Sequence, residues 1–254
     1  MMNLQHVAID SGRVARITLR RAPLNVLNLK MLAELGQAFT SVSRDRPAVV
    51  VLAAEGKAFS AGVDIADHTE EKVGGMLELF HTIFRTMADM DAPVIALVQG
   101  AALGGGCELI TACDLAVATA SARFGQPEIR VGAFPPVAAV ELPVAMGPRR
   151  AAEMLFTGET ISAEEAATGG LINRVFPDAT FATDAAAYVE LVSRHSGAVL
   201  ACTKEALRLG RGRTLQEALP DLETLYLDRL MKTHDAREGL TAFMEKRRPD
   251  FKDS

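Results

Sequence analysis

The stretch Gly100–Ile110, GAALGGGCELI, follows the apolar run PVIALVQ and contains three consecutive glycines. Glycine costs backbone entropy on folding and is poor in helix and strand interiors, so a tight turn explains one or two of them but hardly three. Glu108 follows at once, a carboxylate inside an apolar run. A buried strand, a glycine-rich turn and a helix start together present backbone N–H groups to one point, where negative charge is favoured.

The same order of strand, loop and helix recurs along the first two thirds of the chain. AVVVLAA is β-branched and apolar on both faces, which predicts a buried strand. Alternating strands and helices indicate an α/β fold whose ligands gather at the carboxyl ends of the strands. The expected strands are 6–10, 13–19, 48–54, 93–99 and 114–120, with helices around 29–42 and 77–87 and a short helix after the glycines.

From about residue 148 the chain is mostly helical and rich in Ala and Leu. Ser162 and Glu165 form a capping-box pattern at the start of one of these helices. We expect an α/β core at 1–195 and a helical C-terminal region at 196–254, docked on the core or on a neighbouring subunit. The expected helices are 148–158, 162–170, 181–195, 196–210, 214–235 and 236–251.

Composition limits the class of protein. The 254 residues are 49% hydrophobic and 23% charged, which is typical of a soluble globular protein. The net charge of −5 gives no global basic field for nucleic acid, although local Arg and Lys clusters fit either a solvated surface or a small polyanion. The three cysteines show no metal-ligand spacing. Without a signal peptide or an apolar run of about 18–20 residues, we expect a cytoplasmic protein that binds neither membrane nor metal.

The glycines do not match the standard phosphate-binding motifs. GAALGGG departs from the dinucleotide fingerprint GxGxxG, and no Lys follows to complete a phosphate loop. The same N–H groups can instead form an oxyanion hole for a developing enolate. A second glycine loop, KAFSAGVD at 57–64, also follows a buried strand. Two such loops can converge and contribute one N–H each.

Acids are the best candidates for proton transfer, because no histidine has a companion and no GxSxG elbow is present. Glu108 and Glu128 follow successive strands and could divide labour between water and a proton. Glu108 could instead only stabilise a helix terminus, which is worth about 0.3–1 kcal/mol. Asp114 and Glu141 are the competing acids, and nothing local favours them.

Four segments together resemble the crotonase, or enoyl-CoA hydratase/isomerase, superfamily. The resemblance runs from the first strands to the last helix, with the motifs in the expected order. It implies a spiral of repeated β-β-α units and a helical C-terminal trimerisation region, with a homotrimer or a dimer of trimers as the assembly. The segments are KAFSAGVDI, GAALGGGCELITACDLAVAT, ARFGQPEIRVG and EGLTAFMEKRRPDF.

The resemblance assigns roles to particular residues. It implies that the N–H groups of Val63 and Gly105 hold the thioester oxygen of an acyl-CoA. It gives Glu108 and Glu128 the activation of water and the protonation of carbon. No cofactor is implied beyond the coenzyme A of the substrate. The implied CoA and substrate contacts are Leu24, Val26, Lys57, Ala58, Ala61, Asp64, Ile65, Pro135 and Pro136, with Phe243 and Lys246 reaching the CoA of a neighbouring subunit.

One segment departs from the hydratases of simple enoyl chains. Those resemble PGAGGTQRL after the second acid, whereas this chain reads PPVAAVELP at 135–143. Pro136 has no N–H to hold a catalytic water where those enzymes have Gly. Val63 replaces the commoner Ala and adds bulk beside the thioester. The longer segment FGQPEIRVGAFPPVAAVELP, together with GVDIADHT, looks most like the cyclic dienoyl-CoA (cyclohexa-1,5-dienecarbonyl-CoA) hydratases.

The predicted function is therefore hydration: the syn addition of water across a conjugated C=C of an enoyl-CoA or cyclic dienoyl-CoA thioester. One alternative keeps the scaffold but changes the reaction to double-bond isomerisation, ring-opening hydrolysis or decarboxylation. Another is a non-catalytic acyl-CoA-binding or RNA-associated scaffold, which the two acids and the negative net charge disfavour.

Overall fold

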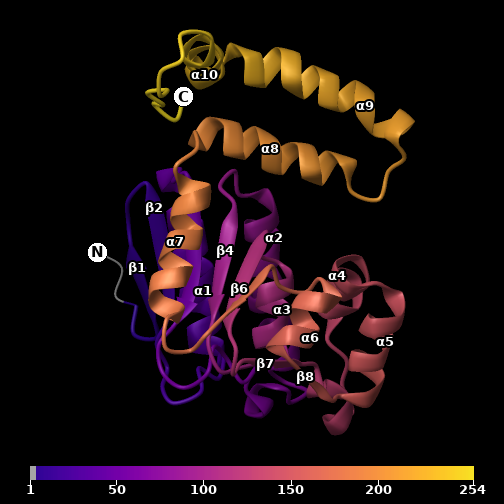
Figure 1. Ribbon diagram of the computed structural model, residues 1–254. Coiled ribbons are helices and arrows are strands. Elements are labelled where there is room, and N and C mark those ends of the chain that lie inside the picture. Colours follow the sequence, from indigo (N-terminus) through magenta and orange to yellow (C-terminus); the bar gives the residue numbers. More distant parts are fainter. Residues whose placement is uncertain (1–3) are drawn as a thin grey trace.

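The computed structural model describes residues 4–254 and is built on a six-stranded sheet (Figure 1). The strand order is β1-β2-β3-β4-β6-β9, in which β1 is antiparallel to β2 and the other neighbours are parallel. The parallel α/β design expected from the sequence is confirmed. The strands are β1 (Val7–Asp10), β2 (Val14–Leu19), β3 (Val49–Ala54), β4 (Val94–Val98), β6 (Leu115–Thr119) and β9 (Arg174–Phe176).

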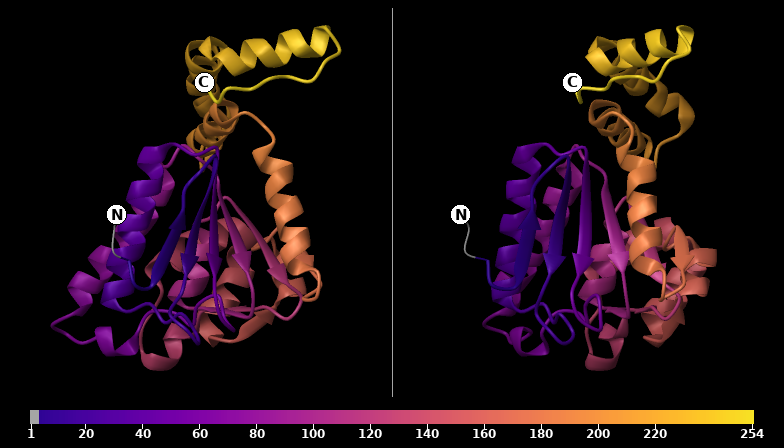
Figure 2. Two further views of the ribbon diagram at one scale, coloured as in Figure 1. Left: turned by 90° about the vertical axis from the view of Figure 1, so that its left-hand side faces the viewer. Right: turned by 60° about the vertical axis from the view of Figure 1, so that its left-hand side comes forward.

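Helices cover both faces of the sheet (Figure 2). The first face packs against α1 (Leu29–Asp45) and α2 (Val73–Asp89), and α7 (Phe181–Ser193) crosses the second. The central strands β3 and β4 are buried along their length, which explains their continuous apolar sequences. The helices α1 and α2 have 17 residues each, and no helix within residues 4–254 is long and apolar enough to cross a membrane.

A smaller sheet lies next to the carboxyl ends of the large one. It consists of β5 (Ala101–Leu103), β7 (Arg123–Gly125) and β8 (Thr160–Ser162). The expectation of a simple glycine loop before α3 (Gly105–Thr111) was wrong at Ala101–Leu103, because β7 pairs with these residues in parallel. Three residues are too few to show a strand period, so only the long-range pairing reveals this strand.

Three helices follow the second sheet. They are α4 (Pro136–Met146), α5 (Pro148–Thr157) and α6 (Ala163–Gly169). The capping box predicted for α6 is confirmed, since the side chains of Ser162 and Glu165 each bond the other's backbone N–H. The helix α4 was not predicted, although Pro136 at its first position is a favourable helix start.

We call residues 196–254 the C-terminal arm. It extends away from the body (Figure 1) and contains α8 (Gly197–Gly210), α9 (Leu215–Thr224) and α10 (His234–Met244). The expected helix 214–235 was wrong in its second half, where a π-helical turn (Leu225–Arg229) and a 3₁₀ turn (Leu230–Lys232) follow α9. Thr233 then starts α10 by accepting the N–H of Ala236.

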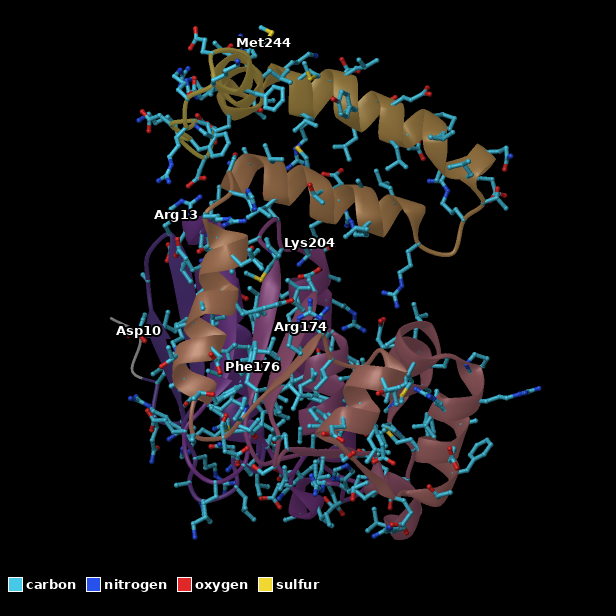
Figure 3. All side chains as sticks on the ribbon, viewed as in Figure 1. Asp10, Arg13, Arg174, Phe176, Lys204 and Met244 are labelled. Carbon is cyan, nitrogen blue, oxygen red and sulfur yellow. The ribbon has the colours of Figure 1, made fainter. Side chains whose placement is uncertain are left out.

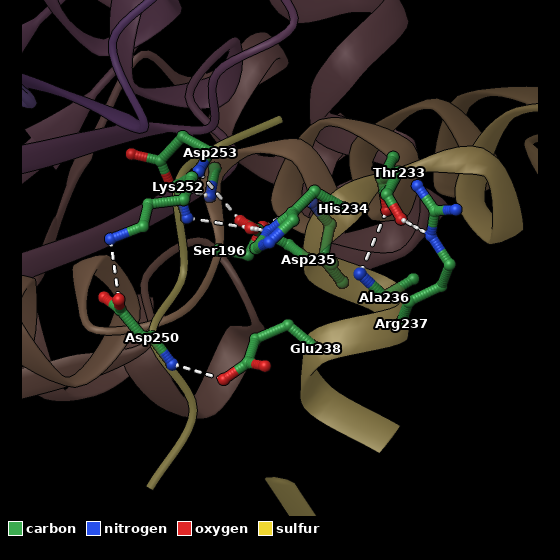
Figure 4. Close-up of polar contacts among 12 residues, drawn as sticks. Ser196, Thr233, His234, Asp235, Ala236, Arg237, Glu238, Asp250, Lys252 and Asp253 are labelled. Carbon is green, nitrogen blue, oxygen red and sulfur yellow. Dashed lines mark hydrogen bonds and ion pairs between the residues drawn. The ribbon is translucent and has the colours of Figure 1, made fainter. Parts of the chain in front are cut away.

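The last helix ends at Met244 rather than near residue 251 because the tail is held in an extended form. The buried carboxylate of Asp235 accepts the backbone N–H groups of Lys252 and Asp253, each at 2.8 Å (Figure 4). Glu238 accepts the N–H of Asp250 at 2.8 Å. These carboxylates supply the partners that a helix would have supplied from its own carbonyls.

Candidate active site

Three segments meet at the carboxyl ends of the strands. The loop after β3 contacts the segment after β4 through a parallel bridge between Ser60 and Ala102. Leu103 of β5 pairs with Gly125 of β7. This pairing places α3, which follows β5, beside the 3₁₀ helix Pro127–Val131, which follows β7. The second sheet is therefore what brings the two predicted acids to one site.

The two predicted oxyanion donors lie on loops that touch each other. A Cβ added to Gly62 would lie 3.0 Å from the carbonyl oxygen of Leu103 and 3.6 Å from the nitrogen of Gly105. A Cβ added to Gly105 would lie 2.7 Å from a methyl group of Val63. The backbone N–H groups of Val63 and Gly105 have no hydrogen-bond acceptor within residues 4–254. Both groups are left to donate to a ligand.

Glu108 projects from the first turns of α3 and is only 3% exposed. Its Oε1 accepts the backbone N–H groups of Val137 at 2.9 Å and Ala138 at 3.0 Å, both at the start of α4. Burial is the main cause that raises the pKa of Glu108 to about 7. The N–H of Ala138 lowers this pKa, the negative charge of Glu128 raises it, and the N–H of Val137 lowers it slightly. Near neutral pH this carboxyl can both accept and release a proton.

Glu128 lies against the glycine turn. A Cβ added to Gly104, whose φ is +51°, would lie 2.5 Å from Glu128 Oε1, so only glycine leaves room for this carboxylate. Within the described part of the chain, the buried Oε2 has no hydrogen-bond partner. Burial raises the pKa of Glu128 above its ordinary value, while its own backbone N–H and the charge of His68 lower it in part.

The competing acids serve the scaffold. Asp114 pairs with Lys204 at 2.8 Å and accepts the N–H of Val94 at 2.7 Å. Glu141 forms an ion pair with Arg211 of the arm. Neither carboxylate adjoins the free N–H groups, so the geometry favours Glu108 and Glu128 as the acids of the site.

The residues implied for CoA contact lie on two loops that run side by side. The N–H of Ala61 donates to the carbonyl of Leu24 at 2.9 Å, and the N–H of Leu27 donates to the carbonyl of Gly62 at 2.9 Å. Leu24 and Lys57 are exposed, Val26 and Ala61 are partly exposed, and Ala58 is buried. A ligand can lie along these loops up to Val63, which follows directly.

Four further residues implied for substrate contact lie directly after Val63 and at the start of α4. Asp64 accepts the N–H of Ala66 at 3.1 Å and caps a 3₁₀ turn, on which Ile65 is exposed. Pro135 and Pro136 stand at the start of α4. Because Pro136 has no N–H, the first amides of α4 that can donate are the two that hold Glu108.

Phe243 and Lys246 lie on the arm, which joins the body at the amino ends of the strands. Lys204 of α8 pairs with Asp114 before β6, and Arg13 before β2 pairs with Asp253 of the tail (Figure 3). The glycine loops follow the opposite, carboxyl ends. The structure therefore does not bring Phe243, which is 84% exposed, or Lys246 to the acids of the same chain.

The backbone donors that hold Glu108 were not predicted from the sequence, because α4 was not predicted. The available signal was the pair Pro135–Pro136, since proline is favoured at the first position of a helix and the next amides are then free. The buried side chains of Asn25 and Ser60 were also missed. They carried no recognisable motif.

Comparisons with known proteins find similarity along almost the whole chain. The family model described as Enoyl-CoA hydratase/isomerase matches residues 10–254. Cyclohexa-1,5-dienecarbonyl-CoA hydratase of Thauera aromatica is 36% identical, covering 93% of this chain and 92% of the relative. 2,3-dehydroadipyl-CoA hydratase of Escherichia coli is 34% identical over 94% and 95% of the two chains. The crystal structure of enoyl-CoA hydratase from Mycobacterium smegmatis superposes with a TM-score of 0.91 at 36% identity, covering 97% and 99%.

Proposed function

Because the chain belongs to the enoyl-CoA hydratase/isomerase family, as its motifs predicted, we propose that it adds water syn across a conjugated C=C of an enoyl-CoA or cyclic dienoyl-CoA thioester. One observation carries the proposal. The buried Glu108 and the partly exposed Glu128, both with raised pKa values, stand beside two backbone N–H groups that have no acceptor within residues 4–254. This set of groups suits an enolate intermediate rather than a hydrolytic triad.

The N–H groups of Val63 and Gly105 hold the thioester oxygen. As the oxygen of water bonds to the β-carbon, the C=C electrons shift through the α-carbon onto the thioester oxygen. The two donors and the amino end of α3 stabilise the negative charge that develops there. The side chain of Val63, packed against Gly105, limits the space beside the thioester.

The two glutamates move the protons. Oε1 of Glu108 is occupied by two N–H groups, which leaves Oε2 to receive a proton from water. Glu128, whose Oε2 has no partner among residues 4–254, gives a proton to the α-carbon. The product has gained H and OH, and transfer of a proton from Glu108 to Glu128 restores both groups. Delivery from one side of the double bond makes the addition syn.

We propose a cyclic dienoyl-CoA as the preferred substrate. The segment PPVAAVELP supports this choice, because Pro136 supplies no N–H and the amides after it hold Glu108 instead of a water. The identity to the Thauera aromatica hydratase is a second support. CoA would run along Leu24, Val26, Lys57, Ala58 and Ala61, with Asp64, Ile65, Pro135 and Pro136 near the acyl group.

We also propose a homotrimer or a dimer of trimers. Phe243 and Lys246 lie at the far end of the molecule from the acids and would serve the CoA of a neighbouring subunit. Several large apolar side chains of the arm are exposed in the single chain, which supports their burial in an assembly. They are Leu207, Leu215, Leu219, Leu227, Leu240, Phe243 and Met244.

A panel of straight-chain and cyclic enoyl-CoA thioesters, followed by mass spectrometry, tests the proposed function. Hydration gives a product heavier by one water with CoA still attached. Isomerisation leaves the mass unchanged, and decarboxylation lowers it by the mass of carbon dioxide. Ring-opening hydrolysis also adds one water, but its product carries a new carboxylate, which tandem mass spectrometry distinguishes from the hydroxyl group of the hydration product. Turnover of a cyclic dienoyl-CoA well above that of crotonyl-CoA is expected, and the reverse order would refute the substrate assignment.

A further inference from the structure

Asn25 is fully buried among loops that have no regular secondary structure. Its side-chain Nδ2 donates to the carbonyls of Glu55 at 2.7 Å and Ala58 at 2.9 Å. Its Oδ1 accepts the backbone N–H of Arg21 at 2.7 Å. The residue has a φ of +49°, a conformation that asparagine tolerates better than most residues. One side chain thus supplies the partners for three loop backbone groups.

Ser60 continues this network toward the predicted oxyanion donors. Its Oγ donates to the carbonyl of Asn25 at 2.8 Å and accepts the N–H of Gly62 at 3.2 Å. Gly62 immediately precedes Val63. The Val63 N–H belongs to the Gly62–Val63 peptide group. The Ser60 hydroxyl therefore fixes the peptide group directly before it, Ala61–Gly62.

The backbone of Ser60 reaches the second donor loop. Its N–H donates to the carbonyl of Ala101 at 3.1 Å, and its carbonyl accepts the N–H of Leu103 at 2.9 Å. A Cβ added to Gly106 would lie 2.6 Å from both the Cβ and the carbonyl oxygen of Ser60. The first turn of α3, which begins at Gly105, consequently packs directly on Ser60.

We infer that Asn25 and Ser60 are positioning residues that hold the N–H groups of Val63 and Gly105 at one fixed separation and direction. This inference rests on the proposed function. Neither side chain touches the reacting atoms. They act through the loop backbone, whose buried polar groups would otherwise lack partners. Such support matters because displacement of a catalytic donor by about 1 Å can cost about 100-fold in rate.

The variants Ser60→Ala and Asn25→Asp test the inference. The first removes the hydroxyl that links Asn25 to Gly62. The second keeps the shape of the side chain but turns its donor into an oxygen facing two carbonyls. The matched control is Ser196→Ala, an equally buried serine that accepts the N–H of Val199 at 3.2 Å at the start of α8, at the opposite end of the body.

The readout is the absorbance of bound 4-aminocinnamoyl-CoA, a conjugated thioester whose band shifts to the red when its carbonyl oxygen accepts hydrogen bonds. We expect Ser60→Ala and Asn25→Asp to lose at least half of the wild-type red shift and to lower kcat about 10- to 100-fold. Affinity for butanoyl-CoA, which reports binding of the CoA portion, should change little. Ser196→Ala should lose thermal stability but keep the red shift and kcat.

If folded Ser60→Ala protein keeps the red shift and the kcat of the wild type, the inference is overturned. This result decides the matter even if Asn25→Asp does not fold. A red shift lost equally in Ser196→Ala would overturn it too, because the effect would then follow general destabilisation. Failure of the proposed function has a different signature, since the wild-type protein itself would neither hydrate enoyl-CoA thioesters nor shift the probe.

Discussion

Glu108 Oε1 accepts the backbone N–H of Val137 at 2.9 Å, so the helix that follows the second acid fixes the direction of the first. The same oxygen accepts the N–H of Ala138, and two donors on one oxygen leave the other oxygen as the reactive one. The arrangement combines a buried carboxyl, whose pKa is raised to about 7, with backbone groups that prevent it from turning away.

The first prediction concerns the acids themselves. Glu108→Gln preserves an oxygen for the N–H groups of Val137 and Ala138 but cannot accept a proton, so kcat should fall by about 10²–10⁴-fold with the fold intact. Glu128→Gln should have a loss of the same order. Steady-state kinetics with an enoyl-CoA measure both. Glu141→Gln, on α4 and paired with Arg211, is the control and should stay near wild type. Activity retained in either acid variant contradicts its assigned role.

The second prediction concerns the glycine under Glu128. Gly104→Ala places a Cβ 2.5 Å from Glu128 Oε1 at a φ of +51°, which displaces the carboxylate and strains the backbone. We expect kcat to fall at least tenfold and the free energy of unfolding to drop by about 1 kcal/mol. Gly212→Ala matches the strain at a φ of +71° but meets nothing within 4 Å. It should lose stability alone, and equal losses of kcat in both variants would contradict the account.

The third prediction follows from the pKa of Glu108. This pKa is raised from 4.5 to about 7 in the folded chain, so the folded state binds more protons than the unfolded state between these values. The free energy of unfolding contributed by this group therefore falls as pH rises from 4.5 to 7, by roughly 3 kcal/mol. Urea unfolding at several pH values checks this. Glu108→Gln should lack that slope, and an unchanged slope in the variant would refute the assignment.

The fourth prediction is the pH dependence of the rate. If ionised Glu108 accepts the proton of water, kcat/KM for hydration should rise as pH increases through about 7. Because Glu128 must carry the proton that it gives to the α-carbon, the profile should fall again at higher pH, where Glu128 ionises. The pH dependence of kcat/KM, measured with an enoyl-CoA that dissociates faster than it reacts, tests this. A limb that instead titrates near the ordinary value of 4.5 would show that Glu108 is not the group that must be ionised.

The fifth prediction concerns the arm. If Phe243 and Lys246 serve a neighbouring subunit, the double variant Phe243→Ala/Lys246→Ala should raise KM for acyl-CoA while leaving kcat little changed. Assemblies that mix these double-variant subunits with Glu108→Gln subunits should regain activity. In some of their sites the double-variant subunit supplies an intact Glu108 and the neighbouring Glu108→Gln subunit supplies an intact arm. Activity that equals the average of the two separate variants would contradict contribution in trans.

The sequence predicted the parallel core because β3 and β4 are long, apolar on both faces and followed by glycine turns. It did not reveal β5, β7 or β9, since strands of three residues have no measurable period and exist only through pairing with distant segments. The pairing of β5 with β7 is what explains why Glu108 and Glu128 meet. Sequence separation alone could not establish it.

Other features depended on chemistry outside the local pattern. The helix 214–235 was overextended because its Leu spacing continues through a π-helical turn. The structural roles of Asn25 and Ser60 could not be recognised from the sequence. A buried polar residue that bonds distant loop carbonyls has no local pattern that distinguishes it from a polar surface residue. By contrast, the capping box of α6 was predictable because all its partners lie within four residues.

The mass of the product formed from a cyclic dienoyl-CoA, compared between wild type and the Glu108→Gln/Glu128→Gln double variant, tests the central claim most directly. We expect a thioester heavier by one water with the wild-type protein and unchanged substrate with the double variant. Equal conversion by both proteins, or release of free CoA by the wild type, would contradict it.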